Sequence, residues 1–224
     1  IRRTTIAERY FAAAYRRAFD PVWYGPGRIG RDYRSRHAML TMHIWFLHKR
    51  LVVQGDTESL AIQEELFELL WNNTKSRIRE QGLNELTINK HLNETQQVSF
   101  QHLTHYDHAY EQFSGKAEKR FEELAAIVWI HVLNRSETAT DDQLHRMALY
   151  IEAQYENIVH VCPAEYFNEG RIASVRIPNF DEIRDANTGK ALPPNPIPPE
   201  DILPENWYSF LNEAGKVYYY NMET

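Results

Sequence analysis

Three apolar segments of helical periodicity, each built around a tryptophan, constrain the fold of this 224-residue chain most strongly. The first is apolar nearly all round, which is typical of a central helix that other helices cover. The other two repeat their apolar residues every three or four positions, as helices with one buried face do. The pattern predicts an all-α fold. The segments are LTMHIWFLHKRLVVQG (40–55), LFELLWNNTKSRIREQG (66–82) and LAAIVWIHVLNR (124–135).

Caps and helix-breaking residues divide the first part of the chain into about six helices, which we expect to form a bundle. Gly55 ends the central helix, as glycine often does. Thr87 is expected to cap the fourth helix, and Thr140 with Gln143 forms a capping box for the last one. Pro163 ends that last helix. The predicted helices cover about residues 6–19, 32–54, 58–81, 87–113, 121–132 and 140–162.

The character of the chain changes after Pro163. Residues 166–177 contain a glycine and β-branched residues, and we expect a loop or a short hairpin there. The segment ALPPNPIPPEDILP (191–204) has six prolines, which predict an extended polyproline strap. We therefore divide the chain into a basic N-terminal helix and loop (1–31), a helical domain (32–177), a Pro-rich linker (178–201) and a small β segment (202–224).

Charge is divided unevenly along the chain, whose formal net charge is −6. Residues 1–50 carry 11 Arg and Lys against 3 Asp and Glu, whereas residues 51–224 carry 14 against 28. One interpretation is a basic N-terminal arm that contacts an anionic partner, such as rRNA, an acidic protein or anionic lipid. The other is a solvated helix face that pairs with the acidic remainder of the chain. The candidate contacts are Arg2, Arg3, Arg16, Arg17, Arg31, Arg34 and Arg36.

Residues able to do chemistry are present, but they form no recognisable catalytic set. His102, His105 and His108 share one predicted helix face beside Asp107. No cysteine or second histidine motif supports a metal site there, and we interpret these histidines as solvated. Cys162 lies at a predicted helix C-terminus, where the helix dipole disfavours a thiolate, so we expect it to pack. The sequence predicts no enzyme, no metal and no cofactor.

The helical tryptophans Trp45, Trp71 and Trp129 have two interpretations. A tryptophan on an apolar helix usually packs in the core with its indole N–H bonded. It can also line a groove that receives a helix of another protein. Both interpretations stay open, and all three residues are candidates for protein binding. No run of about 18 uncharged apolar residues occurs, so no segment is predicted to span a bilayer.

Five segments, in order and with natural gaps, carry a resemblance to a known family. Together, residues of about 35–177 resemble the ubiquinol–cytochrome c chaperone domain family, the mitochondrial assembly factors for cytochrome b and their α-proteobacterial relatives. The resemblance implies an all-α bundle without enzymatic activity. It further implies a protein that binds a small helical partner, contacts the mitochondrial ribosome near its peptide exit, and receives newly made cytochrome b. The segments are MHIWFLHKRLVVQG (42–55), FELLWNNTKSRIREQGL (67–83), HYDHAYEQF (105–113), LAAIVWIHVLNR (124–135) and MALYIEAQYENI (147–158).

A second resemblance lies at the C-terminal end. The segment ILPENWYSFLNEAGKVYYYNMET (202–224) looks like the first two strands of a WW domain, with Trp207 as its buckle residue. The resemblance implies that Tyr218 lines a groove for proline-rich peptides, and we take Tyr218 and Tyr220 as candidate protein contacts. The second groove wall of a WW domain is a later tryptophan, which this sequence does not include, so peptide binding does not follow. A two-stranded piece is marginal alone, and we expect it to dock on something.

Two functions are compatible with these patterns. The first is a non-catalytic mitochondrial chaperone that binds newly made cytochrome b through an apolar helical surface during bc1 complex assembly. The alternative is a permanent structural subunit of a large mitochondrial complex, such as the mitoribosome or a respiratory or ATP synthase assembly. The strap, the WW-like segment and the basic arm favour the alternative, because such extensions commonly wrap neighbouring subunits. Both imply a location on the matrix side or peripheral to the inner membrane.

Overall fold

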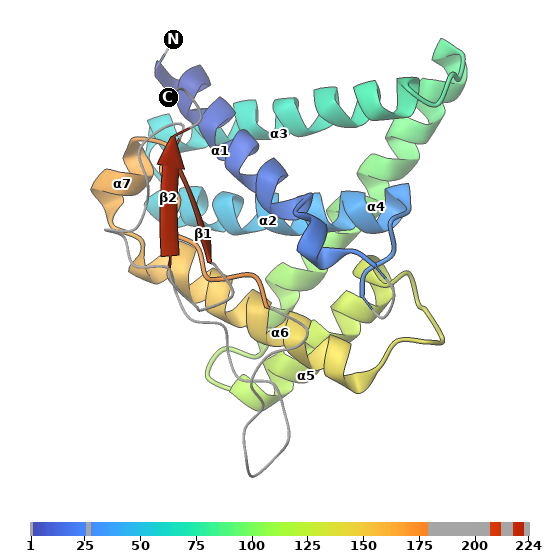
Figure 1. Cartoon of the computed structure of the whole chain (residues 1–224). Helices are drawn as coiled ribbons and strands as arrows, with labels where there is room; N and C mark the ends of the chain where they lie inside the picture. Colours follow the sequence, from blue (N-terminus) through green and yellow to red (C-terminus); the bar gives the residue numbers. More distant parts are fainter. Residues whose placement is uncertain (1, 26–27, 179–206, 212–216, 222–224) are drawn as a thin grey trace.

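The computed structural model describes residues 2–25, 28–178, 207–211 and 217–221. Within these residues the helical region contains seven α-helices and no paired β-ladder, which confirms the predicted all-α bundle (Figure 1). Three short segments of other helical types accompany them: η1 (Pro21–Trp23), η2 (Val128–Val132) and η3 (Glu156–Val161). The α-helices are α1 (Arg2–Ala18), α2 (Tyr33–Gln54), α3 (Thr57–Arg79), α4 (Glu85–Gln112), α5 (Ala117–Ile127), α6 (Asp141–Tyr155) and α7 (Ala164–Asn168).

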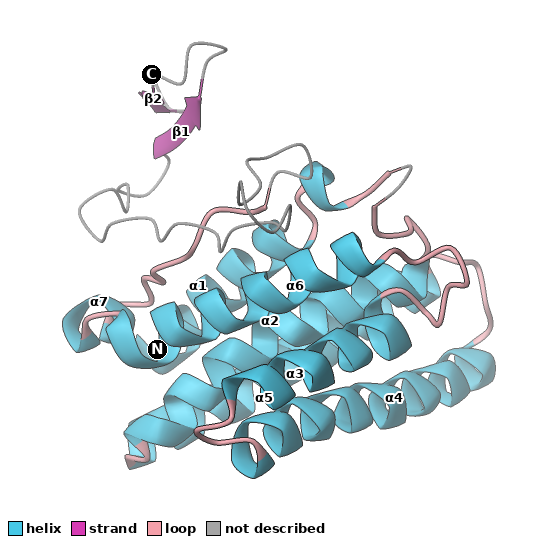
Figure 2. Ribbon diagram, turned by 90° about the horizontal axis from the view of Figure 1, so that it is seen from below, coloured by secondary structure: helices cyan, strands magenta, loops and turns pink. Residues whose placement is uncertain are grey.

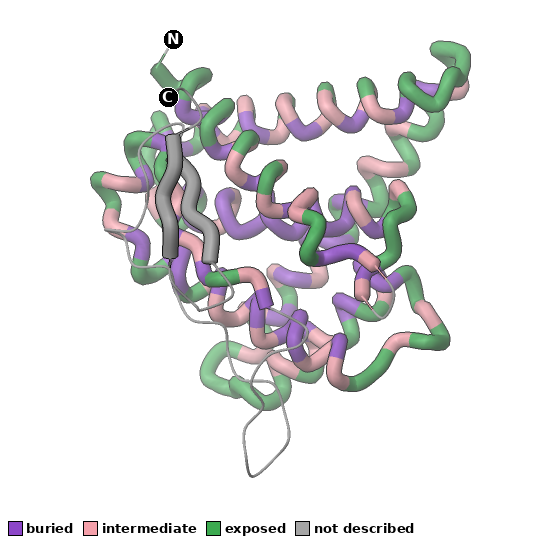
Figure 3. Tube along the Cα trace, in the orientation of Figure 1, coloured by how far each residue is buried: buried purple, intermediate pink, exposed green. Residues whose placement is uncertain are grey.

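Helix α2 is the central helix of the bundle. Fourteen of its 22 residues are buried, because α1, α3, α4, η2 and η3 all pack against it. Figure 2 shows α2 between α1 on one side and α4 on the other. In Figure 3 most of α2 is coloured as buried, whereas the junction between α3 and α4 is exposed. The sequence of α2 is apolar on nearly all faces because other helices of the bundle cover each of these faces.

Side-chain caps mark the starts of α2, α3, α4 and α6. Asp32 caps α2, which ends at Gly55 in the left-handed conformation with a φ of 66°. The predicted capping box at Thr140 is confirmed. The prediction that Thr87 caps the fourth helix is wrong: α4 starts earlier because Asn84 Oδ1 accepts a hydrogen bond from the Thr87 backbone N–H at 3.0 Å. Asparagine and threonine both cap helices, and asparagine is the stronger choice.

Helices α5 and α6 both end in a π-helical turn, η2 after α5 and η3 after α6. A π turn carries one more residue than an α turn and often marks a functional position. Helix α7 then begins directly after Pro163. The prediction of a loop or hairpin from residue 166 onward is therefore wrong at its start, because residues 166–168 belong to this short helix, for which Pro163 is the N-cap.

Helix α7 closes the bundle against α1. The Tyr10 hydroxyl donates a hydrogen bond to the backbone carbonyl of Phe167. The two aromatic rings stack with centroids 4.6 Å apart, and both side chains are buried. The apolar residues of α1 thus belong to the same core as α2 and α3.

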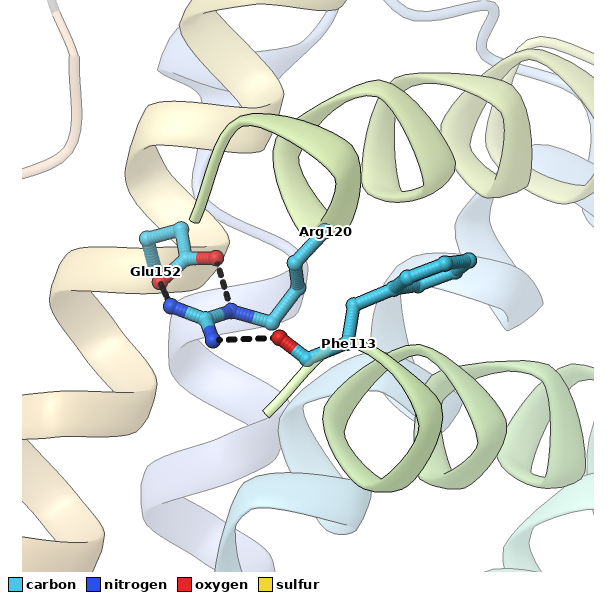
Figure 4. Close-up of polar contacts among 3 residues, drawn as sticks. All are labelled: Phe113, Arg120 and Glu152. Atoms are coloured by element: carbon cyan, nitrogen blue, oxygen red, sulfur yellow. Dashed lines mark hydrogen bonds and ion pairs between the residues drawn. The ribbon is translucent and has the colours of Figure 1, made fainter. Parts of the chain in front are cut away.

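An arginine joins three helices at the other end of the bundle. Arg120 of α5 donates through Nε and Nη2 to the Glu152 carboxylate of α6, at 2.6 and 3.1 Å (Figure 4). Its Nη1 reaches the backbone carbonyl of Phe113, just past the end of α4, at 3.3 Å. The fork of the guanidinium matches the carboxylate in a bidentate pair, and its third nitrogen adds to the Lys116 N–H, which already donates to the Phe113 carbonyl at 3.0 Å.

The C-terminal hairpin consists of β1 (Trp207–Leu211) and β2 (Val217–Asn221), paired antiparallel. Tyr218 is opposite Phe210 and Tyr220 is opposite Tyr208 in this register. Two strands are what the WW resemblance implies, but the predicted Pro-rich linker and the turn between the strands lie outside the described residues. The WW-like function of this segment therefore stays a prediction.

Candidate protein-binding surface

An apolar strip with exposed side chains crosses from α3 to α4. Leu60, Phe67 and Trp71 follow one another on α3 at spacings of seven and four residues, which places them on one helix face. Phe100 of α4 continues this row, with its ring centroid 5.5 Å from that of Trp71. Leu60 is 47% exposed and Phe100 is 52% exposed. We call these four residues the α3–α4 strip.

The strip exists because α3 has more apolar residues than its buried face needs. The buried residues of α3 recur every four positions and face the core. Phe67 and Trp71 each lie one position beyond this row and remain only half-buried, with ring centroids 6.3 Å apart. The buried row is Ile62, Leu66, Leu70, Thr74 and Ile78.

Helix α2 contacts the strip at Phe67. The His48 imidazole meets the Phe67 ring edge-on at 5.5 Å, and burial lowers the pKa of His48, which favours the neutral form. Val52, one turn farther along α2, is exposed, as is its neighbour Val53. Isolated exposed apolar residues are ordinary, but a row of them with aromatic members marks a surface suited to protein binding.

Trp45 has a different role from Trp71, because it lies entirely in the core. Its indole stacks on Tyr155 at 5.3 Å and lies beside Tyr106 at 4.8 Å. The indole Nε1–H donates to Asp107 Oδ1 at 2.8 Å, and Lys49 Nζ lies 3.0 Å from the same oxygen. Of the two interpretations of Trp45, the structure shows the packed and hydrogen-bonded one.

Trp129 is 39% exposed and comes from η2. Its indole Nε1–H donates to the backbone carbonyl of Ser136 at 3.1 Å, which fixes the ring across the turn after η2. That turn contains two non-glycine residues with left-handed backbone, Asn134 at a φ of 50° and Arg135 at a φ of 55°. Trp129 is therefore held in a defined, partly exposed position, and a role in protein binding stays a prediction.

The arginines proposed as contacts for an anionic partner divide into two groups. Arg2, Arg16 and Arg31 are exposed on α1 and the following loop. Each of the other four arginines interacts with another residue of this chain. Arg3 pairs with Glu65 at 2.6 Å, and Arg17 donates a hydrogen bond to the Tyr150 hydroxyl at 3.2 Å. Arg34 donates to Asn134 at 2.9 Å, and the Arg36 guanidinium lies 5.3 Å from the Tyr24 ring centre. Part of the basic excess thus pairs internally, and an rRNA or lipid contact stays a prediction for the exposed group.

His43 and Cys162 are packed in the core. His43 hydrogen-bonds to the Met39 carbonyl at 2.7 Å and to the Tyr150 hydroxyl at 2.8 Å, and burial lowers the pKa of His43 to about 3. His105 Nδ1 lies 2.9 Å from His131 Nε2. Burial raises the pKa of the Cys162 thiol, which disfavours a reactive thiolate.

Within the described part of the chain, no group of three or more histidine, cysteine, aspartate or glutamate side chains is arranged to hold a metal ion. The interpretation of these histidines as solvated is wrong for His102, which is buried because its ring stacks on that of His131 at 4.3 Å, whereas His108 is exposed beside Phe113. None of the described helices has the length and apolar content needed to cross a lipid bilayer.

Comparison with known proteins decides the family. The model of the ubiquinol-cytochrome C chaperone family matches residues 28–172, about two thirds of the chain. The chain belongs to this family. The matched range begins before α2 and ends after α7, so the α3–α4 strip and the core around Trp45 all lie within the chaperone domain. Comparison with curated proteins finds no match.

A solved structure shares the chaperone fold. The crystal structure of the Cbp3 homolog from Brucella abortus superposes with a TM-score of 0.65, at 16% sequence identity. The match covers 77% of this chain and 90% of the other one. At this identity the likeness shows a common fold.

The sequence pointed to Trp71 but not to the other members of the α3–α4 strip. Leu60 and Phe67 share its face at helical spacing, a signal that was present in the sequence. Phe100 lies in a helix whose sequence is mostly polar. Only its contact with Trp71 of α3 identifies it as part of an apolar surface.

Proposed function

We propose that this protein is a non-catalytic assembly chaperone that binds newly made cytochrome b during assembly of the bc1 complex. Membership of the ubiquinol-cytochrome C chaperone family supports this proposal, because the family is associated with mitochondria and with this assembly. The proposed location is the matrix side of the inner membrane or its periphery.

The α3–α4 strip is the observation that carries the proposal. Its aromatic side chains are partly exposed, and ring contacts hold them together: Phe67 packs on Trp71 and on His48 of α2. A rigid aromatic row can bury an apolar helical segment of a client without first ordering itself, which lowers the entropic cost of binding. Cytochrome b is proposed as the source of that segment, and a small helical partner is proposed to share the surface.

The test is capture of cytochrome b by the full chain in translating mitochondria. Wild-type protein should co-purify with labelled, newly made cytochrome b that lacks its cofactors, and a Trp71→Ala/Phe100→Ala variant should lose most of this signal. Leu86→Ala is the matched control, because Leu86 is an apolar residue of α4 that is 85% exposed outside the strip. Equal capture by the double variant and the control would exclude the strip as the client site.

The alternative of a permanent subunit is favoured by one observation. The family match ends at residue 172, and the chain continues with a β-hairpin at residues 207–221 that the chaperone domain does not account for. Native electrophoresis separates the two functions. Presence in one copy in a mature mitochondrial complex supports the subunit, whereas release before the bc1 complex matures supports the chaperone.

A further inference from the structure

A carboxylate lies within the apolar row of the α3–α4 strip. Glu64 follows Leu60 by four residues and precedes Phe67 by three, so it lies on the same face of α3, between these two apolar residues. Glu64 is exposed, as is Glu68, which lies one turn farther along this side of the helix. A segment of another protein that touches both Leu60 and Phe67 must therefore cover Glu64.

Within the described part of the chain, no cation pairs with this carboxylate. Neither Glu64 nor Glu68 forms an ion pair with a described residue. Glu65, which lies between them in the sequence, does form one, because Arg3 of α1 donates to its carboxylate at 2.6 Å. The side of α3 that faces α1 is therefore neutralised, whereas the side that carries the strip keeps its negative charge.

The α4 edge of the strip adds no charge to that of α3. The exposed residues one turn before and one turn after Phe100 are Gln97 and Thr104, which are both uncharged. On α3, Lys75 lies one turn beyond Trp71, where the strip ends. The negative charge is therefore concentrated on the α3 edge, along the half of the strip that precedes Trp71.

The helices that form the strip determine the shape of a partner. Helices α3 and α4 satisfy their backbone groups internally, so a β-strand cannot pair with them, and recognition depends on side chains. Leu60 and Trp71 are eleven residues apart, which corresponds to about 16 Å along the helix axis. A partner helix of about three turns covers this length with apolar residues at every third or fourth position.

The burial of Glu64 on binding determines the chemistry of the partner. A segment that is apolar on all faces, such as a membrane-spanning helix, would remove water from the carboxylate and leave it without a counter-charge, which is costly. A glutamate or aspartate at that position would be repelled. A lysine or arginine there instead forms a charge-assisted hydrogen bond with the carboxylate.

We propose that the α3–α4 strip binds a basic amphipathic helix, which places one lysine or arginine against Glu64 and a second one beside Glu68. The apolar face of this helix covers Leu60, Phe67 and Trp71. The inference rests on the proposed function, because it uses the same surface. It goes beyond that function by assigning the charge of the bound segment, and it selects a basic amphipathic segment over a membrane span that is apolar on all faces.

Binding of three matched peptides to the full chain tests the proposal. Each peptide is a helix of about five turns with the same row of leucines, and its flanks carry lysine, glutamine or glutamate. In fluorescence anisotropy at low salt, the lysine peptide should bind about threefold tighter than the glutamine peptide and about tenfold tighter than the glutamate peptide. Equal affinities for the three peptides, or binding of none of them, overturn the proposal.

Charge reversal at Glu64 locates the contact. Glu64→Lys should reverse the order of the lysine and glutamate peptides, whereas Glu122→Lys, the same change at an exposed glutamate of α5, should keep the wild-type order. This control is needed because the chain has a net charge of −6 and attracts any basic peptide at long range. The same change of affinities in both variants overturns the proposal. Circular dichroism confirms that each variant is folded.

Failure of this inference and failure of the proposed function give different results. If the wild-type protein captures cytochrome b through the strip but binds the three peptides equally, only the assigned charge is wrong. If Glu64→Lys reverses the peptide order, yet the Trp71→Ala/Phe100→Ala variant captures cytochrome b as well as Leu86→Ala does, the assigned charge holds and the client site is wrong.

Discussion

The Trp45 indole and the Asp107 carboxylate join α2 to α4 through a 2.8 Å hydrogen bond, and Lys49 shares the same carboxylate oxygen at 3.0 Å. One acidic side chain thus satisfies a buried N–H and neutralises a nearby cation. The pair therefore ties the middle of α2 to the C-terminal half of α4.

Asp107→Ala should lower the free energy of unfolding by about 1–3 kcal/mol, because it leaves the buried Trp45 N–H without an acceptor. Asp107→Asn keeps an acceptor oxygen and loses only the Lys49 ion pair, so we expect a loss of under about 1 kcal/mol. Urea unfolding followed by circular dichroism measures both. A larger loss for the asparagine variant would show that the ion pair, not the indole bond, stabilises this contact.

The tryptophans of the bundle should respond differently to truncation. Trp45→Ala opens a large cavity in the core and should cost about 3–5 kcal/mol, enough to unfold many domains. Trp71→Ala removes a half-buried side chain at the surface and should cost much less while it weakens client capture. The thermal unfolding temperature and the amount of captured client are measured for both variants and compared. If Trp71→Ala also unfolds the protein, its side chain belongs to the core.

Arg120 provides a second stability test. Arg120→Lys should lower the free energy of unfolding by about 1–2 kcal/mol, since lysine cannot form the bidentate pair with Glu152 and reach the Phe113 carbonyl together. Arg79→Lys is the matched control. Arg79 pairs with Glu85 at 2.7 Å, but both side chains are more than half exposed, and such pairs contribute little. Similar losses in the two variants would contradict the role given to Arg120.

Acid should destabilise the protein through its buried histidines. Burial lowers the pKa of His37 and His43 to about 3, whereas the unfolded chain takes up these protons near pH 6.5. The stabilising contribution is therefore complete above pH 6.5 and is lost as pH falls from there toward 3, by up to about 1.4 kcal/mol per pH unit for each histidine.

Denaturant unfolding at pH 7, 6 and 5 measures this slope. His43→Gln should flatten it, because glutamine takes up no proton in the unfolded state. His108→Gln, a change at an exposed histidine of α4, should leave it as in the wild type. An unchanged slope in His43→Gln would mean that other groups cause the acid sensitivity.

The exposed arginines allow the anionic-partner prediction to be tested. A variant with Arg2, Arg16 and Arg31 changed to Gln should bind single-stranded RNA more weakly and with a shallower dependence on salt, because fewer counterions are released. Arg17→Gln removes a charge already engaged with Tyr150 and should change the salt dependence less. If the RNA affinity of the wild-type protein does not change between low and moderate salt concentration, the prediction is wrong.

The central helix could be predicted from the sequence because its pattern has few alternatives. Helix α2 spans 33–54 against a prediction of about 32–54, since an Asp and a Gly mark its ends and its apolar residues leave no polar face. The start of α4 was predicted wrongly because Asn84 and Thr87 are both suitable N-cap residues. Only the hydrogen bond from the Thr87 N–H to Asn84 shows that Asn84 is the N-cap.

The surface features depended on long-range contacts that periodicity does not encode. Trp45 and Trp129 occupy similar apolar runs, yet one is fully buried and the other is 39% exposed, because Trp129 falls in a π turn that shifts the helix face. Phe100 becomes part of an apolar strip only through Trp71, 29 positions earlier. A cavity beside α2 likewise combines residues from four elements.

The uneven burial of the tryptophans provides a natural optical signal. Trp23 and Trp45 have no accessible surface, so their fluorescence should be blue-shifted and insensitive to acrylamide. Trp71 and Trp129 retain contact with solvent, and their emission should respond when another polypeptide covers them. A titration can therefore report on each of these two faces without a dye, once Trp207 and the other member of the pair are replaced by phenylalanine.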